Sequence, residues 1–172
     1  EVSVVMPCLN ERDGIVSCIN KAKAAIKLNN LNAEIIVADN GSTDNSQGIV
    51  AKFEEVKWLP LGKNYGFGEG NNRAVAKTKQ DIVILINTDV ITSKNFILPL
   101  IECFKDNTVF AVSCQQEVRT KEKTFIGGGA VGAWTRGLLR HESLEVCYPN
   151  TTQTTNTLYA SGGASAYDRE KF

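Results

Sequence analysis

Short apolar runs recur along the first two thirds of the chain. Runs of about four to eight apolar residues between turn signals are typical of buried strands. The run Asp81–Ile86 is the strongest of them, and the first run stops at Pro7. The five strands that we expect are Val2–Met6, Glu34–Ala38, Val56–Leu59, Asp81–Ile86 and Val109–Cys114.

Between these runs, apolar residues recur every three or four positions, which is the spacing of one helical face. In the first such segment they include Ile15, Ile19, Ala22 and Ile26. The expected helices are Arg12–Leu28, a helix capped by Thr43 or Asp44 that ends near Phe53, one from the Gly66–Gly70 turn through Ala76, and Lys94–Phe104. Strands that alternate with helices predict an α/β fold with a mostly parallel central sheet flanked by helices.

The pattern changes after Gln115. A Gly127–Gly129 run and the polar tract Asn150–Thr157 interrupt the alternation. We expect this part to be irregular or to contain antiparallel strands. The whole chain is expected to form one domain, in which residues 1–114 make one half and residues 115–172 begin another.

Composition narrows the class of protein. The 172 residues are 42% hydrophobic and carry 19 basic and 19 acidic side chains, which supports one well-packed domain and argues against a nucleic-acid binder. The five cysteines contain no CxxC pair, so we expect reduced thiols in a cytoplasmic protein. No long apolar span occurs, so any association with a membrane is expected to come from segments outside this sequence. The cysteines are Cys8, Cys18, Cys103, Cys114 and Cys147.

Polar clusters follow three of the expected strands, namely Pro7–Glu11, Asp39–Ser42 and Asn87–Asp89. Ligands of open α/β sheets bind beyond the carboxyl ends of the strands. If these strands are parallel neighbours, the three clusters meet at one edge of the sheet. That convergence predicts a binding site.

Each of the two aspartates at these strand ends has two interpretations. Asp89, with Asn87, offers the oxygen ligands that Mg²⁺ or Mn²⁺ prefers, but it could equally cap the helix expected from Lys94. Asp39 could accept hydrogen bonds from a nucleoside, although the Asp39–Ser42 segment is also typical of a turn, which is the favoured interpretation for Asp39 taken alone. The Gly66–Gly70 turn could bring backbone amides to a phosphate, but its spacing fits neither a dinucleotide fingerprint nor a P-loop.

Taken together, these segments resemble the inverting family 2 glycosyltransferases, which have the Rossmann-like GT-A fold. The resemblance runs over nearly the whole chain, and the middle segments are similar to the rhamnosyltransferase-like branch. Leu9 stands where that family usually has an aromatic residue. The segments that carry the resemblance are Val4–Glu11, Ile35–Asp44, Asn64–Asn72, Asn87–Asp89 and Ser161–Ala164, which continues through Arg169 to Phe172.

The resemblance implies roles by position. Asp89 would be the direct ligand of Mg²⁺ or Mn²⁺, and Asp39 would contact the base. Gly162, Gly163 and Ala164 would line the acceptor side. The general base would lie beyond Phe172, so the chain is expected to be a fragment that is inactive alone. The residues implied in donor binding are Pro7, Cys8, Asn10, Glu11, Asp39, Ser42, Asn64, Gly66, Asn71, Asn72, Asn87, Thr88 and Asp89.

The expected function is therefore metal-assisted transfer of a hexosyl or deoxyhexosyl group, with inversion, from a nucleotide-diphosphate sugar to a glycan or lipid-linked glycan. The resemblance favours dTDP-rhamnose as donor and the cytoplasm, or the inner face of the membrane, as location. A non-catalytic nucleotide-sugar-binding module is the alternative. A nucleotidyltransferase is disfavoured, because Pro7–Asp13 has no glycine and a single arginine to hold a triphosphate.

Overall fold

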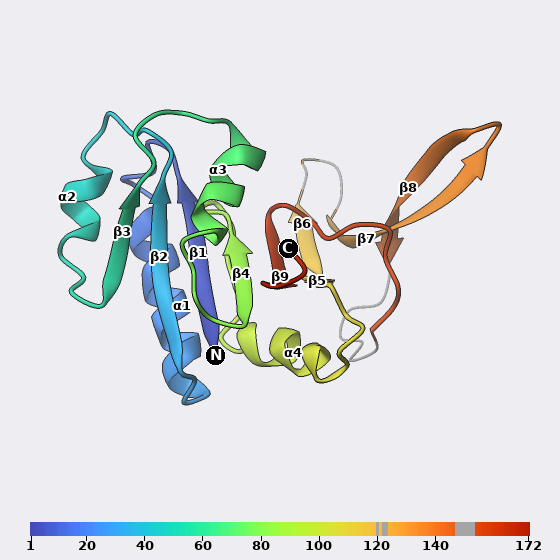
Figure 1. The fold of residues 1–172 in the computed structure, drawn as a ribbon, viewed down its shortest axis with the longest axis horizontal. Helices are drawn as coiled ribbons and strands as arrows, with labels where there is room; N and C mark the ends of the chain where they lie inside the picture. The colour runs from blue at the N-terminus through green and yellow to red at the C-terminus, as the bar shows by residue number, and fades with distance from the viewer. Residues whose placement is uncertain (120, 122–123, 147–153) are drawn as a thin grey trace.

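A six-stranded sheet forms the centre of the molecule in the computed structural model, which describes residues 1–119, 121, 124–146 and 154–172 (Figure 1). The strand order is β3-β2-β1-β4-β9-β5. The first four strands in this order are parallel, and β9 runs antiparallel to both of its neighbours. The strands are β1 (Val2–Cys8), β2 (Ala33–Asp39), β3 (Val56–Pro60), β4 (Ile82–Ile86), β5 (Ala111–Ser113) and β9 (Ala164–Asp168).

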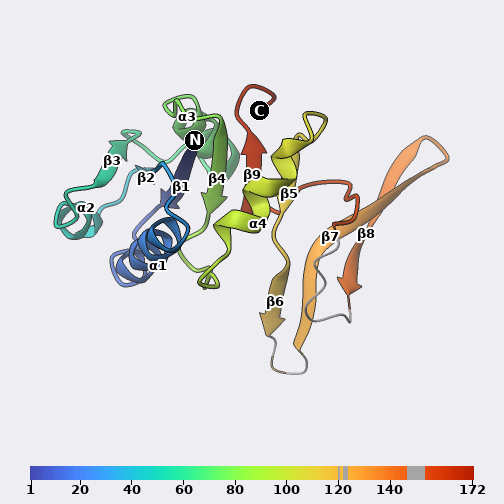
Figure 2. The same ribbon diagram turned by 90° about the horizontal axis from the view of Figure 1, so that it is seen from below.

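Helices cover both faces of this sheet (Figure 2). Because successive side chains of a strand point to opposite faces, Val4 packs with the buried residues of α1, α2 and α4, whereas Val5 packs with those of α3. Burial on both faces explains why β4 is apolar throughout and β1 nearly so. The helices are α1 (Ile15–Leu28), α2 (Ser46–Val50), α3 (Phe67–Val75) and α4 (Ile97–Glu102), which continues into the short 3-10 helix η1 (Cys103–Lys105).

Three of the predicted helices are shorter than expected. The first begins at Ile15, not Arg12, because residues 12–14 form a turn. The cap of α2 is Asn45 rather than Thr43 or Asp44, although the Asp44 carboxylate still accepts a hydrogen bond from the Ser46 N–H at 2.9 Å. The helix expected from Lys94 begins at Ile97 without a side-chain cap, so Asp89 does not cap it.

A second, three-stranded antiparallel sheet follows β5, with the order β6-β7-β8. It consists of β6 (Gln116–Arg119), β7 (Thr124–Thr135) and β8 (Leu138–Val146). The prediction of antiparallel strands after Gln115 is confirmed, and the Gly127–Gly129 run lies inside β7. Gly128 has a φ of 121°, and a Cβ atom there would overlap the carbonyl oxygen of Cys114, so this position requires glycine.

The two halves expected from the sequence share the main sheet. Strand β9 comes from the second half, yet it pairs with β4 and β5 of the first. The boundary at residue 114 stays a prediction. Among the described residues, no helix is long and apolar enough to cross a membrane. Cys147 and residues 150–153 of the polar tract lie outside the described residues.

Candidate functional site

A cleft of about 320 Å³ lies at the carboxyl ends of β1, β2 and β4. This is the edge of the sheet at which the three polar clusters were expected to meet. Of the residues implied in donor binding, those that line the cleft are Pro7, Cys8, Glu11, Asn64, Gly66, Asn71, Asn87, Thr88 and Asp89. The other lining residues are Leu9, Ala38, Asn40, Leu61, Phe67 and Gly70.

Asn10, Asp39 and Ser42 do not line the cleft, and hydrogen bonds among them join the loops that follow β1 and β2. The Asp39 carboxylate accepts a hydrogen bond from the Ser42 N–H at 2.9 Å, and the Ser42 hydroxyl accepts one from the Asn10 N–H at 2.9 Å. The Asn10 amide oxygen in turn accepts the Thr43 N–H at 2.8 Å. Asp39 therefore has the turn role weighed for it above, and its contact with a base stays a prediction.

Asn40 holds the loop that leads into α3, and it was not among the predicted site residues. Its amide nitrogen donates to the Gly66 carbonyl at 3.0 Å, and its amide oxygen accepts the Tyr65 N–H at 3.0 Å. A Cβ atom on Gly70 would lie 3.0 Å from the same amide nitrogen. Only glycine leaves room for this contact, and the Asp39–Ser42 cluster, which contains Asn40, was the available signal.

The two neighbouring asparagines of α3 differ in position. Asn71 is only 4% exposed, lines the cleft and has a buried amide oxygen without a hydrogen-bond partner. Asn72 is exposed and does not line the cleft. Because a buried amide oxygen without a partner is costly, Asn71 is a strong candidate to accept a hydrogen bond from a ligand.

The Asn87–Asp89 loop is held from two sides. The Asn87 N–H donates to the Gly163 carbonyl at 2.9 Å. On the other side, the Cys18 thiol of α1 donates to the Thr88 carbonyl at 2.8 Å. Burial raises the pKa of the Cys18 thiol, so the sulfur keeps the proton that this bond needs.

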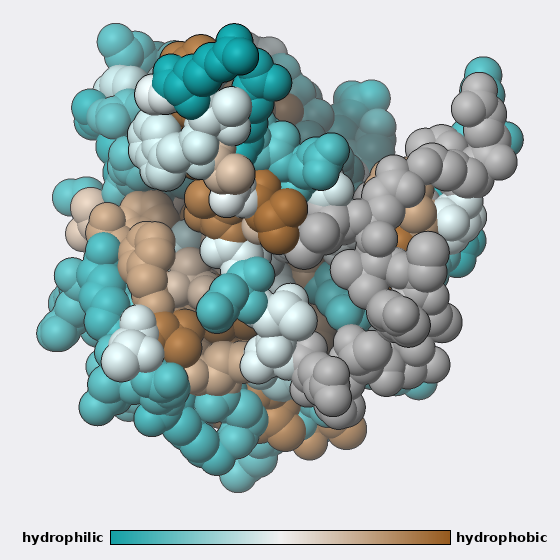
Figure 3. All heavy atoms as spheres, turned by 90° about the vertical axis from the view of Figure 1, so that its right-hand side faces the viewer, coloured by the Kyte–Doolittle hydropathy of each residue, from teal (hydrophilic) through white to brown (hydrophobic). Residues whose placement is uncertain are grey.

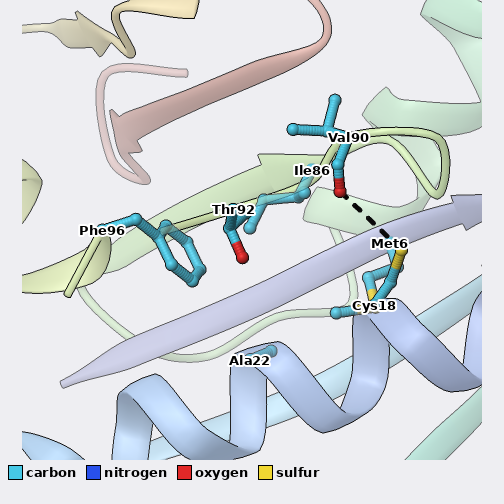
Figure 4. Close-up of a pocket in the computed structure, with 7 residues that line it drawn as sticks. All are labelled: Met6, Cys18, Ala22, Ile86, Val90, Thr92 and Phe96. Carbon is cyan, nitrogen blue, oxygen red and sulfur yellow. Dashed lines mark hydrogen bonds between the residues drawn. The ribbon is translucent and has the colours of Figure 1, made fainter. Parts of the chain in front are cut away.

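Beneath this loop, α1 meets the segment that leads to α4. Figure 4 shows Cys18 and Ala22 of α1 facing Val90, Thr92 and Phe96 across a small gap that has no room for a water molecule. This packing sets the distance between the Asn87–Asp89 loop and α1. The gap is therefore a packing contact beneath the loop and not a ligand site.

The glycines predicted for the acceptor side directly precede β9 and lie next to residues that line the cleft. A Cβ atom on Gly162 would lie 3.0 Å from the ring of Phe67, which is 54% exposed in the cleft. A Cβ on Gly163 would lie within 4 Å of the side-chain amides of Asn87 and Gln116, and Ala164 is buried in β9. The structure thus brings the predicted acceptor segment beside the loop that carries Asp89.

The polar atoms at this loop fit a hard cation. The Asn87 amide oxygen is buried without a hydrogen-bond partner, and Asp89 is an exposed carboxylate two residues later. Among the described residues, no cluster of three or more histidine, cysteine, aspartate or glutamate side chains could hold a metal alone. A cation here would need further oxygen ligands from a bound molecule, which is how Mg²⁺ is commonly held between a carboxylate and phosphates.

Comparison with known proteins gives partial matches to three sugar transferases and synthases. The low-salt glycan biosynthesis hexosyltransferase Agl6 of Haloferax volcanii is 44% identical over 66 residues, which are 38% of this chain and 16% of that protein. An undecaprenyl-phosphate 4-deoxy-4-formamido-L-arabinose transferase of Pseudomonas savastanoi is 32% identical over 52% of this chain and 28% of its own. Glucosyl-3-phosphoglycerate synthase of Mycobacterium tuberculosis is 32% identical over 57% of this chain and 32% of its own. The matches therefore span a third or less of each relative.

Solved structures share the fold. The mannosyltransferase PcManGT of Pyrobaculum calidifontis, in complex with GDP-Man and Mn²⁺, superposes with a TM-score of 0.60 at 22% identity over 66% of this chain and 34% of its own. Glucosyl-3-phosphoglycerate synthase of Mycobacterium tuberculosis, with Mn²⁺, UDP and glucosyl-3-phosphoglycerate, gives 0.54 at 27% identity over 65% and 42%. The fold is GT-A, as the sequence predicted. The profile of "Glycosyl transferase family 2" matches residues 3–172, and since this is nearly the whole sequence, the chain belongs to that family.

Proposed function

We propose that this chain is the donor-binding part of an inverting glycosyltransferase. It would bind a nucleoside diphosphate sugar in the cleft and transfer a hexosyl or deoxyhexosyl group to an acceptor hydroxyl. The observation that carries the proposal is the pairing of the exposed Asp89 carboxylate with the unpartnered Asn87 amide oxygen, at a cleft whose volume suits a small ligand. The solved structures with GDP-Man or UDP and Mn²⁺ support it.

The roles of the residues follow from their positions. Asp89 and Asn87 would hold Mg²⁺ or Mn²⁺ together with diphosphate oxygens, and the cation would stabilise the charge of the leaving diphosphate. Asn71 and Asn64, which also line the cleft, would orient the nucleotide or its sugar. Inversion in one displacement needs a base for the acceptor proton, which we place after Phe172.

The donor and the acceptor are proposed from resemblance. The rhamnosyltransferase-like segments favour dTDP-rhamnose. An acceptor that is a glycan or a lipid-linked glycan is consistent with the undecaprenyl-phosphate transferase of Pseudomonas savastanoi. This function implies a location in the cytoplasm or at the inner face of the membrane.

Calorimetry on the full-length protein with UDP, dTDP and GDP, with and without Mn²⁺, tests the proposal. We expect one nucleotide to bind more tightly with Mn²⁺. Asp89→Ala should weaken that metal-dependent binding by about tenfold or more, because it removes one charged ligand of the cation. Glu54→Gln removes an exposed carboxylate away from the cleft and serves as the control. Unchanged metal-dependent binding by Asp89→Ala would show that the role of Asp89 is wrong.

Transfer must then be measured separately from binding. A full-length protein that binds the nucleotide sugar but neither hydrolyses nor transfers it would be the non-catalytic binding module. A protein that binds none of the three nucleotides would contradict both functions.

A further inference from the structure

The β7–β8 hairpin extends away from the rest of the molecule (Figures 1 and 2). Its two strands are joined by Arg136 and Gly137, whose φ values of 52° and 78° are typical of a tight two-residue hairpin turn. Four large apolar residues near the tip are exposed: 46% for Val131, 74% for Trp134, 66% for Leu138 and 47% for Leu139. Figure 3 faces this side of the molecule and shows hydrophobic and hydrophilic residues side by side on its upper part.

The exposed apolar residues occupy both faces of the hairpin. Trp134 pairs with Leu139 across the two strands, so these two share one face. Leu138 pairs with Thr135, one position further along, and therefore lies on the opposite face. A flat protein partner would cover one face only. A lipid interface, in contrast, surrounds a projecting tip on both faces.

Only positive charges lie at the outer end of the hairpin, whereas Glu142 and Glu145 follow further from the turn in β8. Residues 124–141 contain no aspartate or glutamate, and their fully charged residues are Arg136 and Arg140. Both arginines are exposed. Anionic lipid surfaces attract such residues, and tryptophan is enriched at the level of the headgroups. The arginine at the turn limits the depth, because a guanidinium in the hydrocarbon core is costly.

We propose that the outer end of the β7–β8 hairpin docks on an anionic lipid bilayer at the level of the headgroups. Arg136 and Arg140 bind lipid phosphates, while Trp134, Leu138 and Leu139 enter the interface between them. In Figure 1, β2 and β4, whose carboxyl ends lie at the cleft, run upward, and the hairpin tip points to the same side. The docked tip would therefore bring the open side of the cleft toward the bilayer. This inference goes beyond the proposed function, which names a reaction and not a surface.

Co-sedimentation of the full-length protein with vesicles tests the proposal. The probes are vesicles of phosphatidylcholine alone and vesicles with one quarter phosphatidylglycerol. We expect binding to the anionic vesicles that weakens at high salt. Arg136→Gln and Arg140→Gln should each weaken it about fivefold, and Leu138→Ser/Arg136→Gln more than either arginine change alone.

Leu28→Ser/Lys27→Gln is the matched control. It removes a leucine of similar exposure, 63%, and one positive charge from the end of α1. This variant should bind vesicles like the unchanged protein. Equal loss in the control and the hairpin variant would contradict the proposal, as would the absence of binding to anionic vesicles.

Tryptophan fluorescence reports the docked segment directly. The 172 residues contain two tryptophans, Trp58 and Trp134, so the signal of Trp134 is the difference in emission between the Trp58→Phe and the Trp58→Phe/Trp134→Phe proteins. The emission of Trp134 should shift to shorter wavelength with anionic vesicles. If Trp134 shifts only as the protein concentration rises, and gel filtration shows a dimer, the tip binds a second copy and the lipid proposal is wrong. Nucleotide calorimetry on the hairpin variant should be unchanged, so this test and that of the proposed function fail separately.

Discussion

The parallel part of the main sheet and the β7–β8 hairpin both carry apolar residues, but they use them differently. In β1 and β4 these side chains are buried between helices, and the polar residues that follow the strands line the cleft. In the hairpin, Trp134 and Leu138 are exposed near a tight turn. The parallel strands thus gain their stability from within the chain, whereas the apolar residues of the hairpin are available to a partner.

Removing one apolar residue from each region tests this difference most directly. Ile84 is fully buried in the core, so Ile84→Ala should lower the free energy of unfolding by about 3–4 kcal/mol, from lost burial and the cavity left behind. Leu138→Ala should change it by less than about 0.5 kcal/mol, because that side chain is largely exposed. Urea unfolding followed by circular dichroism measures both. A large loss from Leu138→Ala would mean that the tip is packed within the chain.

Two glycines, one near the base of the hairpin and one at its turn, are expected to show a smaller difference in their effect on stability. Gly128→Ala places a side chain at a φ of 121° and against the Cys114 carbonyl, so it should destabilise the protein by about 2–3 kcal/mol. Gly137 also has a positive φ, but nothing lies within 4 Å of an added Cβ, so Gly137→Ala should cost about 1 kcal/mol. Thermal unfolding of the two variants checks this order. The reverse order would contradict the close contact between β7 and Cys114.

The parallel strands could be predicted from the sequence, whereas β9 and the details of the hairpin could not. Strands β1, β2 and β4 were predicted because burial on both faces leaves a largely apolar run, as in Asp81–Ile86, and the edge strand β3 was predicted from a shorter run. Strand β9 was not predicted, since its Ala164–Ala166 segment of small residues has no such signal and its place between β4 and β5 depends on pairing with distant residues. The place of the Gly127–Gly129 run inside a strand was not predicted, because the close approach of Cys114 is not visible in the sequence.

The residues of the site could also be predicted only in part from the sequence. The three strand ends were selected correctly as neighbours, because parallel strands bring their carboxyl ends together. Asn40, Phe67 and Cys18 were missed as parts of the site. Each acts through a contact with a segment distant in the sequence, such as the bond from Cys18 to the Thr88 carbonyl. Spacing along the chain does not encode such contacts.

Cys114 lies between the main sheet and the β7–β8 hairpin. The titration of its thiol gives the smallest of the three main changes expected in the free energy of unfolding. Its N–H donates to the Ala164 carbonyl of β9, and burial raises the pKa of its thiol to about 11. The native state therefore holds the proton more tightly than the unfolded chain, whose thiol titrates near its ordinary pKa of about 8.5–9. The stability from this group is fully present below that value and is lost as the pH rises toward 11. Between pH 8 and pH 10 the free energy of unfolding should fall by about 1.5 kcal/mol more in the unchanged protein than in Cys114→Ala, as measured by urea unfolding at each pH. Parallel pH curves for the two proteins would mean that the thiol is as well solvated in the native state as in the unfolded chain, and that the main sheet and the base of the hairpin do not close over it.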